Sequence, residues 1–188
     1  MVRSSSQIAI EALQLLIVAV ICSFTLHAYM QGTQPRREEI EAMIEAEDLN
    51  VNTPPGVVAN RQNTRIFRWS KWSSDMQLYI GTNAIGQSVS LTLPAIANGT
   101  YDVLGFFTRA KDYGIIQNYI NDEPVGEPVD LYSGDREVRG TGRIVLGRVK
   151  ITSSPNVWTL KVVGVNSNSI NSKFQMGLDG IIFVPAIN

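Results

Sequence analysis

Cysteine and histidine are almost missing from this sequence: Cys22 and His27 are the only residues of their kinds among 188. A single cysteine excludes an intrachain disulfide and any metal site built from several cysteines. One histidine is too few for a His-rich zinc site, and since both Cys22 and His27 lie in the apolar run at 8–30, the rest of the chain has neither residue to build a Ser-His-Asp triad or a Cys-His pair. The most common forms of nucleophilic and zinc chemistry are therefore excluded.

An excess of charge is also missing. Lysine and arginine total 16 and aspartate and glutamate total 17, which leaves a formal net charge of −1 at pH 7. Proteins that bind nucleic acid through its phosphates usually carry a basic excess. We therefore expect no nucleic acid partner.

Long apolar runs are absent except for one, "IAIEALQLLIVAVICSFTLHAYM" at residues 8–30. Its length exceeds the roughly 20 residues that cross the hydrocarbon core of a bilayer. A secretory signal peptide is the alternative, but its apolar part is usually about 7–15 residues and ends at a small-residue cleavage site. Only "LHA" at 26–28 resembles such a site. We predict one uncleaved transmembrane helix within residues 1–32.

The positive-inside rule does not orient this helix, because Arg3 precedes the apolar run and Arg36 and Arg37 follow it. A β-rich domain that follows an N-terminal anchor is usually exported. We therefore expect a single-pass membrane protein whose β-domain lies on the periplasmic or extracellular side.

Polar residues form a stripe on the predicted membrane helix. Gln7, Glu11 and Gln14 recur at helical spacing. Polar groups within a membrane usually face protein or water, so the stripe favours contact with other membrane-protein subunits. Near the opposite end of the run, His27 is a candidate ligand for a haem or chlorophyll-type pigment, or simply an interfacial residue.

Beyond the anchor, residues 33–42 are predicted to form a short linker or amphipathic turn, and the Pro- and Asn-rich residues 50–64 a loop. The hydrophobic period then becomes two, as in "QSVSLTLPA" at 87–95. Further strands are predicted at 100–110, 114–122, 143–151, 157–165 and 178–186. This pattern indicates an all-β domain over residues 43–188, an antiparallel β-sandwich or jelly roll.

One stretch, "KDYGIIQNYINDEPVGEPVDLYSG" at 111–134, predicts a hairpin. Asn121 and Asp122 suit its turn, because short Asx side chains tolerate left-handed backbone. Pro124 and Pro128 cannot donate ladder hydrogen bonds, so they would protect an edge strand. The stretch is predicted to have a structural role, with ligand binding left open.

Several segments follow one another in an order that is similar to a known group of domains. They are "IEAEDL", "QLYIG", "FFTRAKDYGIIQNYINDEPVGEPVDLY", "WTLKVVGVNSNS" and "FQMGLDGIIFVP". The series resembles β-sandwich carbohydrate-binding modules of bacterial extracellular proteins. It looks still more like a related jelly-roll domain of unknown function attached to predicted glycan-processing proteins. The resemblance covers roughly residues 43–186 and implies a non-catalytic module.

The same resemblance implies a structural Ca²⁺ held by acids of the opening segment and an acid near the last strand. In this chain these residues are Glu45, Glu47 and Asp179. Glu45 and Glu47 are two apart, so on a strand they would share a face. Backbone carbonyls would complete the six to eight oxygen ligands of the ion. The alternative is a solvated acidic strand end.

Aromatic side chains offer a second candidate site, because sugars stack on exposed rings. We single out Trp72, Tyr113 and Tyr132, which a sugar-binding face would expose; the alternative is packing in the core, where we place Trp158. Acidic residues crowd the segment 112–135, and glycosidases use paired carboxyls. Such acids are common in turns, however, and we predict no enzymatic activity.

These observations favour a non-catalytic accessory subunit of a larger membrane complex, such as a respiratory or photosynthetic one, whose β-sandwich braces its partners. The alternative is a membrane-tethered carbohydrate-binding module. A pilin-like filament subunit ranks lower, because no processing motif precedes the helix.

Overall fold

The structure, a computed structural model, describes residues 42–67, 70–134, 137–170 and 174–186. All of them belong to the second of the two units into which the chain divides, Gln34–Asn188. The predicted membrane helix at 1–32 lies outside the described residues, as does nearly all of the linker at 33–42. Within the described ranges, no helix is long and apolar enough to cross a membrane.

Eleven strands and two short 3₁₀ helices make up the described part of the chain. They are β1 (Ile44–Glu45), η1 (Ala46–Asp48), β2 (Asn50–Asn52), β3 (Val58–Asn63), η2 (Ser73–Asp75), β4 (Met76–Gly81), β5 (Ser88–Leu93), β6 (Gly99–Arg109), β7 (Gly114–Ile120), β8 (Glu123–Asp130), β9 (Arg139–Ile151), β10 (Asn156–Val165) and β11 (Met176–Pro185).

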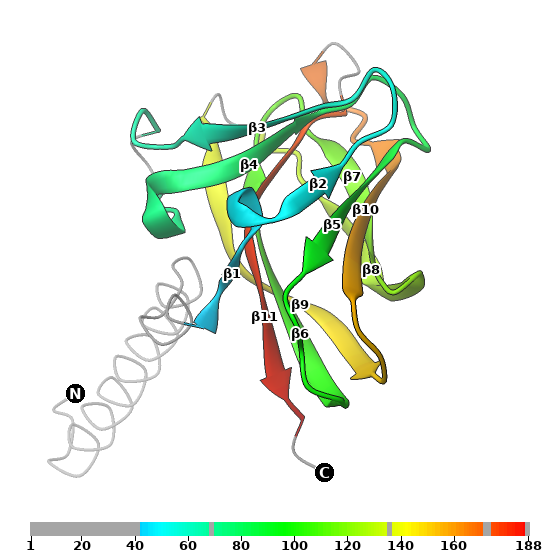
Figure 1. The fold of residues 1–188 in the computed structure, drawn as a ribbon. Helices are drawn as coiled ribbons and strands as arrows, with labels where there is room; N and C mark the ends of the chain where they lie inside the picture. The colour runs from blue at the N-terminus through cyan, green and yellow to red at the C-terminus, as the bar shows by residue number, and fades with distance from the viewer. Residues whose placement is uncertain (1–41, 68–69, 135–136, 171–173, 187–188) are drawn as a thin grey trace, which may run out of the picture. The chain divides into compact units, whose positions relative to one another are not determined.

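The strands form two antiparallel sheets that face each other (Figure 1). One sheet has the order β3-β4-β11-β6-β9, with the short β1 paired to β11 as well, and the other has the order β2-β5-β10-β7-β8. Only β3–β4 and β7–β8 are consecutive strands that pair within one sheet; the other connections between named strands cross from sheet to sheet. The predicted all-β antiparallel sandwich is confirmed.

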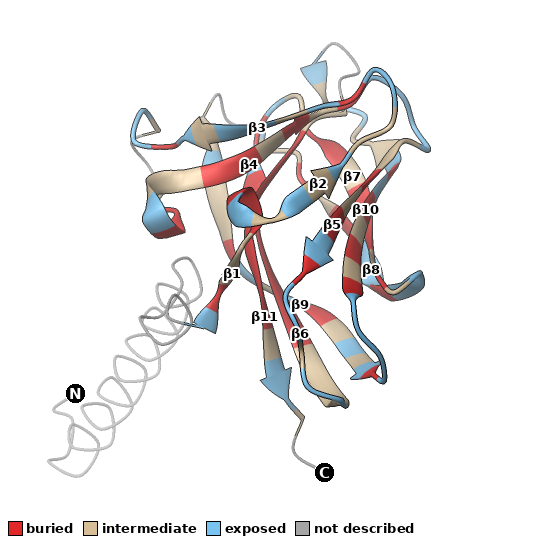
Figure 2. Ribbon diagram, in the orientation of Figure 1, coloured by how far each residue is buried: buried red, intermediate tan, exposed pale blue. Residues whose placement is uncertain are grey.

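The core lies between the two sheets, where buried residues recur along the strands (Figure 2). In β5 the alternation seen in the sequence holds: Val89, Leu91 and Leu93 are buried. Trp158 is fully buried, as predicted, and its ring packs edge-on against Phe107 at 6.2 Å between centroids.

The predicted hairpin at 111–134 is also confirmed. Strands β7 and β8 pair through a two-residue turn in which Asn121 and Asp122 have φ of 51° and 67°. Such left-handed values at both positions produce the twist that hairpin strands need. Strand β8, which carries Pro124 and Pro128, is the last strand of its sheet. The prolines therefore lie on an edge, where a missing N–H costs little.

The predicted loop at 50–64 is wrong, because it contains β2 and β3. Both are edge strands of their sheets. Edge strands contribute little to the core, and the burial of β3 shows only two partly buried positions among six. The apolar alternation that reveals a half-buried strand is therefore weak there. Strand β4 is a further strand that was not assigned from the sequence.

Candidate functional site

The structure brings two of the three predicted calcium ligands to one serine. The hydroxyl oxygen of Ser73, in η2, lies 2.6 Å from Oε2 of Glu45 and 2.7 Å from Oδ1 of Asp179. The backbone N–H of Ser73 also donates to Asp179 Oδ1 at 3.1 Å. A hydroxyl has one proton to donate, so only one carboxylate can receive it. The carboxylate that does not receive this proton is less stabilised, which favours its protonation or a nearby cation.

The strand on which Glu45 and Glu47 were expected to share a face is not formed. Strand β1 ends at Glu45, and Glu47 lies in η1. That part of the prediction is wrong, because the chain leaves one sheet here and turns toward the other. The alternative of a solvated strand end is also wrong for Glu47 and Asp179, which are both buried.

The electrostatics of the three acids are coupled. Burial raises the pKa of Asp179 to about 7, and the charges of Glu45 and Glu47 push in the same direction. Burial likewise raises the pKa of Glu47 to about 7, and it raises that of Glu45. One oxygen of Glu47, Oε2, is buried without a hydrogen-bond partner. An unpaired buried carboxylate is costly, so this cluster favours protons or a cation.

Within the described ranges, no group of three or more His, Cys, Asp or Glu side chains is arranged so that it could hold a metal ion. The donor chemistry of the cluster nevertheless fits Ca²⁺, which prefers carboxylate, hydroxyl and carbonyl oxygens. Glu45, Glu47 and Asp179 would supply its negative ligands. A structural Ca²⁺ at these residues therefore stays a prediction.

Two of the three aromatic candidates are buried, so the prediction that they are exposed is wrong. Trp72 is only 5% exposed, and its indole N–H donates to the hydroxyl of Thr108 at 2.7 Å. Tyr113 is only 4% exposed, and burial raises its pKa far above the ordinary range. Both rings serve the packing of the domain. Tyr132 is half-buried, and a role in binding stays a prediction for it.

A groove between two edge strands offers a different site. It lies between β8 and β9 and has a volume of about 570 Å³. Its apolar lining comes from Val129 and Leu146, which are buried, and from Pro128, Ile144 and Val145. Its charged lining comes from Arg109, Glu127 and Asp130. Open concave sites that combine apolar surface with a few convergent polar groups are the usual form of a ligand site.

Backbone irregularities shape this groove. Register shifts interrupt the pairing of β8 between Val125 and Val129 and the pairing of β9 around Leu146. Gly126 has φ of +65°, and a Cβ there would lie 1.7 Å from the carbonyl oxygen of Leu146. The two edge strands thus approach each other backbone to backbone at Gly126. The bulge in β8 gives the groove one wall and that in β9 the other.

The three charged residues of the groove differ in their freedom. Asp130 is fixed, because its carboxylate accepts from the backbone N–H of Tyr132 at 2.9 Å and from the side chain of Asn166 at 2.6 Å. Arg109 and Glu127 are exposed, and within the described ranges no hydrogen bond or ion pair engages either side chain. The groove therefore presents one free cationic donor and one free anionic acceptor to a ligand. Tyr132 follows Asp130 by two residues and is tied to it.

These groove residues were not predicted from the sequence as a site. Glu127 and Asp130 were noted only as acids within 112–135, and Arg109 and Val145 were not noted. A signal does exist, since glycines at 126 and 147 interrupt two strand patterns, and such glycines mark bulges. The contact between the two edges is tertiary, however, and no local pattern reveals it.

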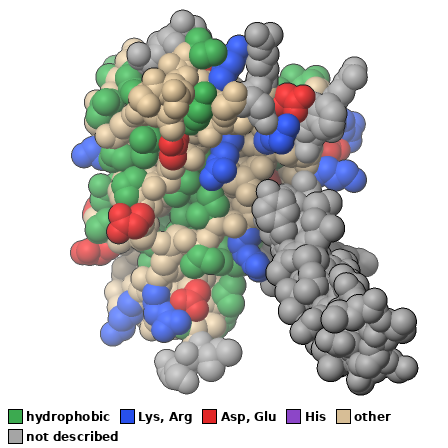
Figure 3. All heavy atoms as spheres, turned by 180° about the vertical axis from the view of Figure 1, so that it is seen from behind, with side chains coloured by type: hydrophobic (Ala, Val, Ile, Leu, Met, Phe, Trp, Pro, Cys, Tyr) green, Lys and Arg blue, Asp and Glu red, His purple; other side chains and the backbone are tan. Residues whose placement is uncertain are grey.

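Surface charge is mixed on the face shown in Figure 3, where acidic and basic side chains are interspersed among hydrophobic ones. The remaining predicted residues, Gln7, Glu11, Gln14 and His27, lie outside the described residues. Contact with membrane-protein subunits and pigment or haem ligation therefore stay predictions.

Comparison with known proteins gives likeness in structure only: no family model and no curated protein matches the chain. A xanthan lyase from Paenibacillus matches with a TM-score of 0.63 and 25% identity, over 77% of this chain and 13% of the lyase. A GH26-CBM35 β-(1,4)-mannanase from Podospora anserina matches over 78% of this chain and 28% of its own, with 15% identity and a TM-score of 0.48.

A family 35 carbohydrate-binding module from Clostridium thermocellum matches over 77% of this chain and 97% of its own, with 15% identity and a TM-score of 0.47. The chain thus spans a small part of the two enzymes. The likeness to a segment of the xanthan lyase supports the β-sandwich fold.

Proposed function

We propose that this chain is a non-catalytic carbohydrate-binding module whose groove between β8 and β9 takes part of a polysaccharide. The observation that carries the proposal is the pairing, in one groove, of an apolar lining with the free side chains of Arg109 and Glu127. A pyranose ring has apolar C–H faces and a rim of hydroxyls. Val145 and Pro128 would contact the face, and the two charged groups would hydrogen-bond the rim.

Two further points support the proposal. Hydrogen bonds to charged groups are stronger than those between neutral groups, so two free charged side chains give a sugar-sized site useful affinity. The chain is also similar to a segment of a lyase that acts on xanthan, a polysaccharide. The accessory-subunit function preferred from the sequence rests on residues 1–32 and has no support among the described residues. Carbohydrate binding, the alternative there, comes first here.

The test is a glycan array that includes xanthan, probed with the full chain in mild detergent, followed by calorimetric titration of the best ligand. Arg109→Ala removes a charged donor and Glu127→Gln replaces a charged acceptor with a neutral one, so each should weaken binding about tenfold. Glu123→Gln, on the same strand, and Lys150→Ala, on β9, are matched controls and should leave affinity unchanged, because neither residue lines the groove.

Binding to no glycan on the array would overturn the function. Binding that Arg109→Ala and Glu127→Gln leave intact would keep the function but exclude this groove as its site. Loss of binding in Tyr132→Ala alone would move the site to the neighbouring loop.

A further inference from the structure

A braced turn between β3 and β4 holds an isoleucine out in solvent. The backbone N–H of Phe67 donates to the carbonyl of Thr64 at 2.9 Å, which closes a turn with Arg65 and Ile66 at its centre. Ile66 is 72% exposed, the highest value among the exposed large hydrophobic residues of the described ranges. Single exposed apolar residues are common, so the exposure of Ile66 indicates a function only if the residues around it do so as well.

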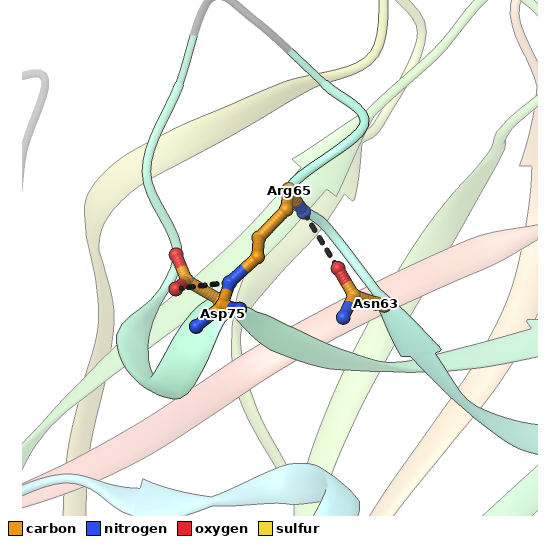
Figure 4. Close-up of polar contacts among 3 residues, drawn as sticks. All are labelled: Asn63, Arg65 and Asp75. Atoms are coloured by element: carbon orange, nitrogen blue, oxygen red, sulfur yellow. Dashed lines mark hydrogen bonds and ion pairs between the residues drawn. The ribbon is translucent and has the colours of Figure 1, made fainter.

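The surroundings fix the turn in this shape. The side chain of Arg65 reaches across the loop to Asp75, with Nε 2.8 Å from Oδ2, and its backbone N–H donates to Asn63 (Figure 4). The N–H of Thr64 donates to the carbonyl of Asp75 at 2.9 Å. The ring of Phe67 lies 5.6 Å from that of Trp72. These contacts hold the backbone on both sides of Ile66, which lies at the exposed centre of the turn.

Two basic residues belong to the same loop as the apolar tip: Arg65 precedes Ile66, and Lys71 follows it by five residues. Arg65 uses one guanidinium N–H on Asp75 and keeps others for a ligand. Lys71 is exposed, and within the described ranges its side chain has no hydrogen bond or ion pair. Apolar side chains together with basic side chains are what bind a protein surface to the interface of an anionic bilayer.

The loop is tied to the point where the chain enters the domain. Ser73, at the far end of the loop, contacts Met43 Sδ at 3.3 Å and Glu45 at 2.6 Å. The apolar run at 8–30 precedes Met43, and the residues between Met30 and Met43 span at most about 45 Å when extended. If that run is a membrane anchor, the tether gives the turn a high effective concentration at the bilayer, so that even weak contacts form.

From these observations we infer that the turn Thr64–Phe67 is a membrane-contact element. Ile66 enters the interfacial region of an anionic bilayer, while Arg65 and Lys71 bind lipid phosphates. The inference is independent of the carbohydrate groove, which lies between other strands.

The test places an environment-sensitive NBD dye at position 66 of the full chain. Ile66→Cys is made in a Cys22→Ser background, so the dye has one attachment site, and the protein is reconstituted in vesicles. With phosphatidylglycerol present we expect a rise in dye emission of about threefold over phosphatidylcholine alone, and quenching by doxyl-labelled lipid. Lys71→Glu and 0.5 M salt should each reduce both signals, because surface electrostatics are screened.

The matched control is the same dye at position 145, because Val145 is 68% exposed and lies on the edge strand β9. Both substitutions are at exposed positions, and circular dichroism would check that the variants fold. A dye at position 66 that stays water-like and unquenched, as at position 145, would overturn the inference. The inference would also be overturned if the dye at position 66 were shielded from water only in native membranes and never in vesicles. A protein partner, and not lipid, would then cover the turn.

Discussion

Asp179 is a buried carboxyl whose surroundings disfavour its charge. It lies near two other acids, accepts from the backbone N–H of Ser73, and competes with Glu45 for the hydroxyl proton of Ser73. Ser73 has no charge, so it offsets only part of the cost of burying a carboxylate. The folded chain therefore prefers this carboxyl protonated unless a cation joins it.

A pH dependence follows from that preference. The folded pKa of about 7 for Asp179 and Glu47 lies above the ordinary value of an unfolded carboxyl. The folded chain thus binds more protons than the unfolded chain between about pH 4 and pH 7. Stability is full below that window and is lost as pH rises through 7. In EDTA, the midpoint of thermal unfolding should fall by about 5 °C between pH 5 and pH 8.

Calcium should reverse this trend, because the ion binds the ionised carboxylates and its affinity rises with pH. Calorimetry at pH 8 with millimolar Ca²⁺ should restore the midpoint, and Asp179→Asn should flatten the pH profile in EDTA. A midpoint that rises from pH 5 to pH 8 in EDTA, or that ignores Ca²⁺ at every pH, would contradict the account of this cluster.

At the scale of elements, the edges of the two sheets determine the groove. Strands β8 and β9 belong to different sheets, yet they touch at Gly126 and Leu146 because both are bulged there. Bulges bend edge strands and keep them from pairing with other chains. Here the same bulges also open the space that Arg109 and Glu127 line.

Gly126→Ala tests that contact. A Cβ at this position would lie 1.7 Å from the Leu146 oxygen, and φ is +65°. We expect a loss of stability above about 3 kcal/mol, because the two strands must separate. Gly86→Ala is the matched control: it has φ of +92° but nothing within 4 Å, so it should cost only about 1 kcal/mol of backbone strain.

Urea unfolding followed by tryptophan fluorescence would measure both variants. An equal loss of stability in the two variants would mean that the left-handed backbone, and not the close approach of β8 to β9, is what requires glycine at position 126.

At the scale of the whole molecule, the chain divides between Thr33 and Gln34. The first unit contains the apolar run at 8–30 and the second contains the sandwich. We expect the full chain to stay in the membrane pellet after washing with alkaline carbonate, because an apolar run of 23 residues is long enough to span a bilayer as the predicted helix. A chain without residues 1–33 should appear in the supernatant. Release of the full chain by carbonate would contradict the predicted anchor.

Much of the fold was predictable where one face of a strand meets the core. The alternation of Val89, Leu91 and Leu93 and the Asn121-Asp122 turn each follow from local physics, namely a period of two and a backbone that short Asx side chains tolerate. The edge strands β2 and β3 were missed for the same reason, because they bury too little to leave an alternating pattern.

The class of the domain, its main strands and the scarcity of cysteine and histidine could be read from the chain alone, since composition and periodicity are local properties. The tertiary structure alone decided which polar groups meet. It buried Trp72 and Tyr113, gathered Glu45 and Asp179 at Ser73 from three separate elements, and brought Arg109 and Glu127 into one groove. Those contacts join residues far apart in the chain, and their positions depend on sheet order and on bulges that local patterns do not specify.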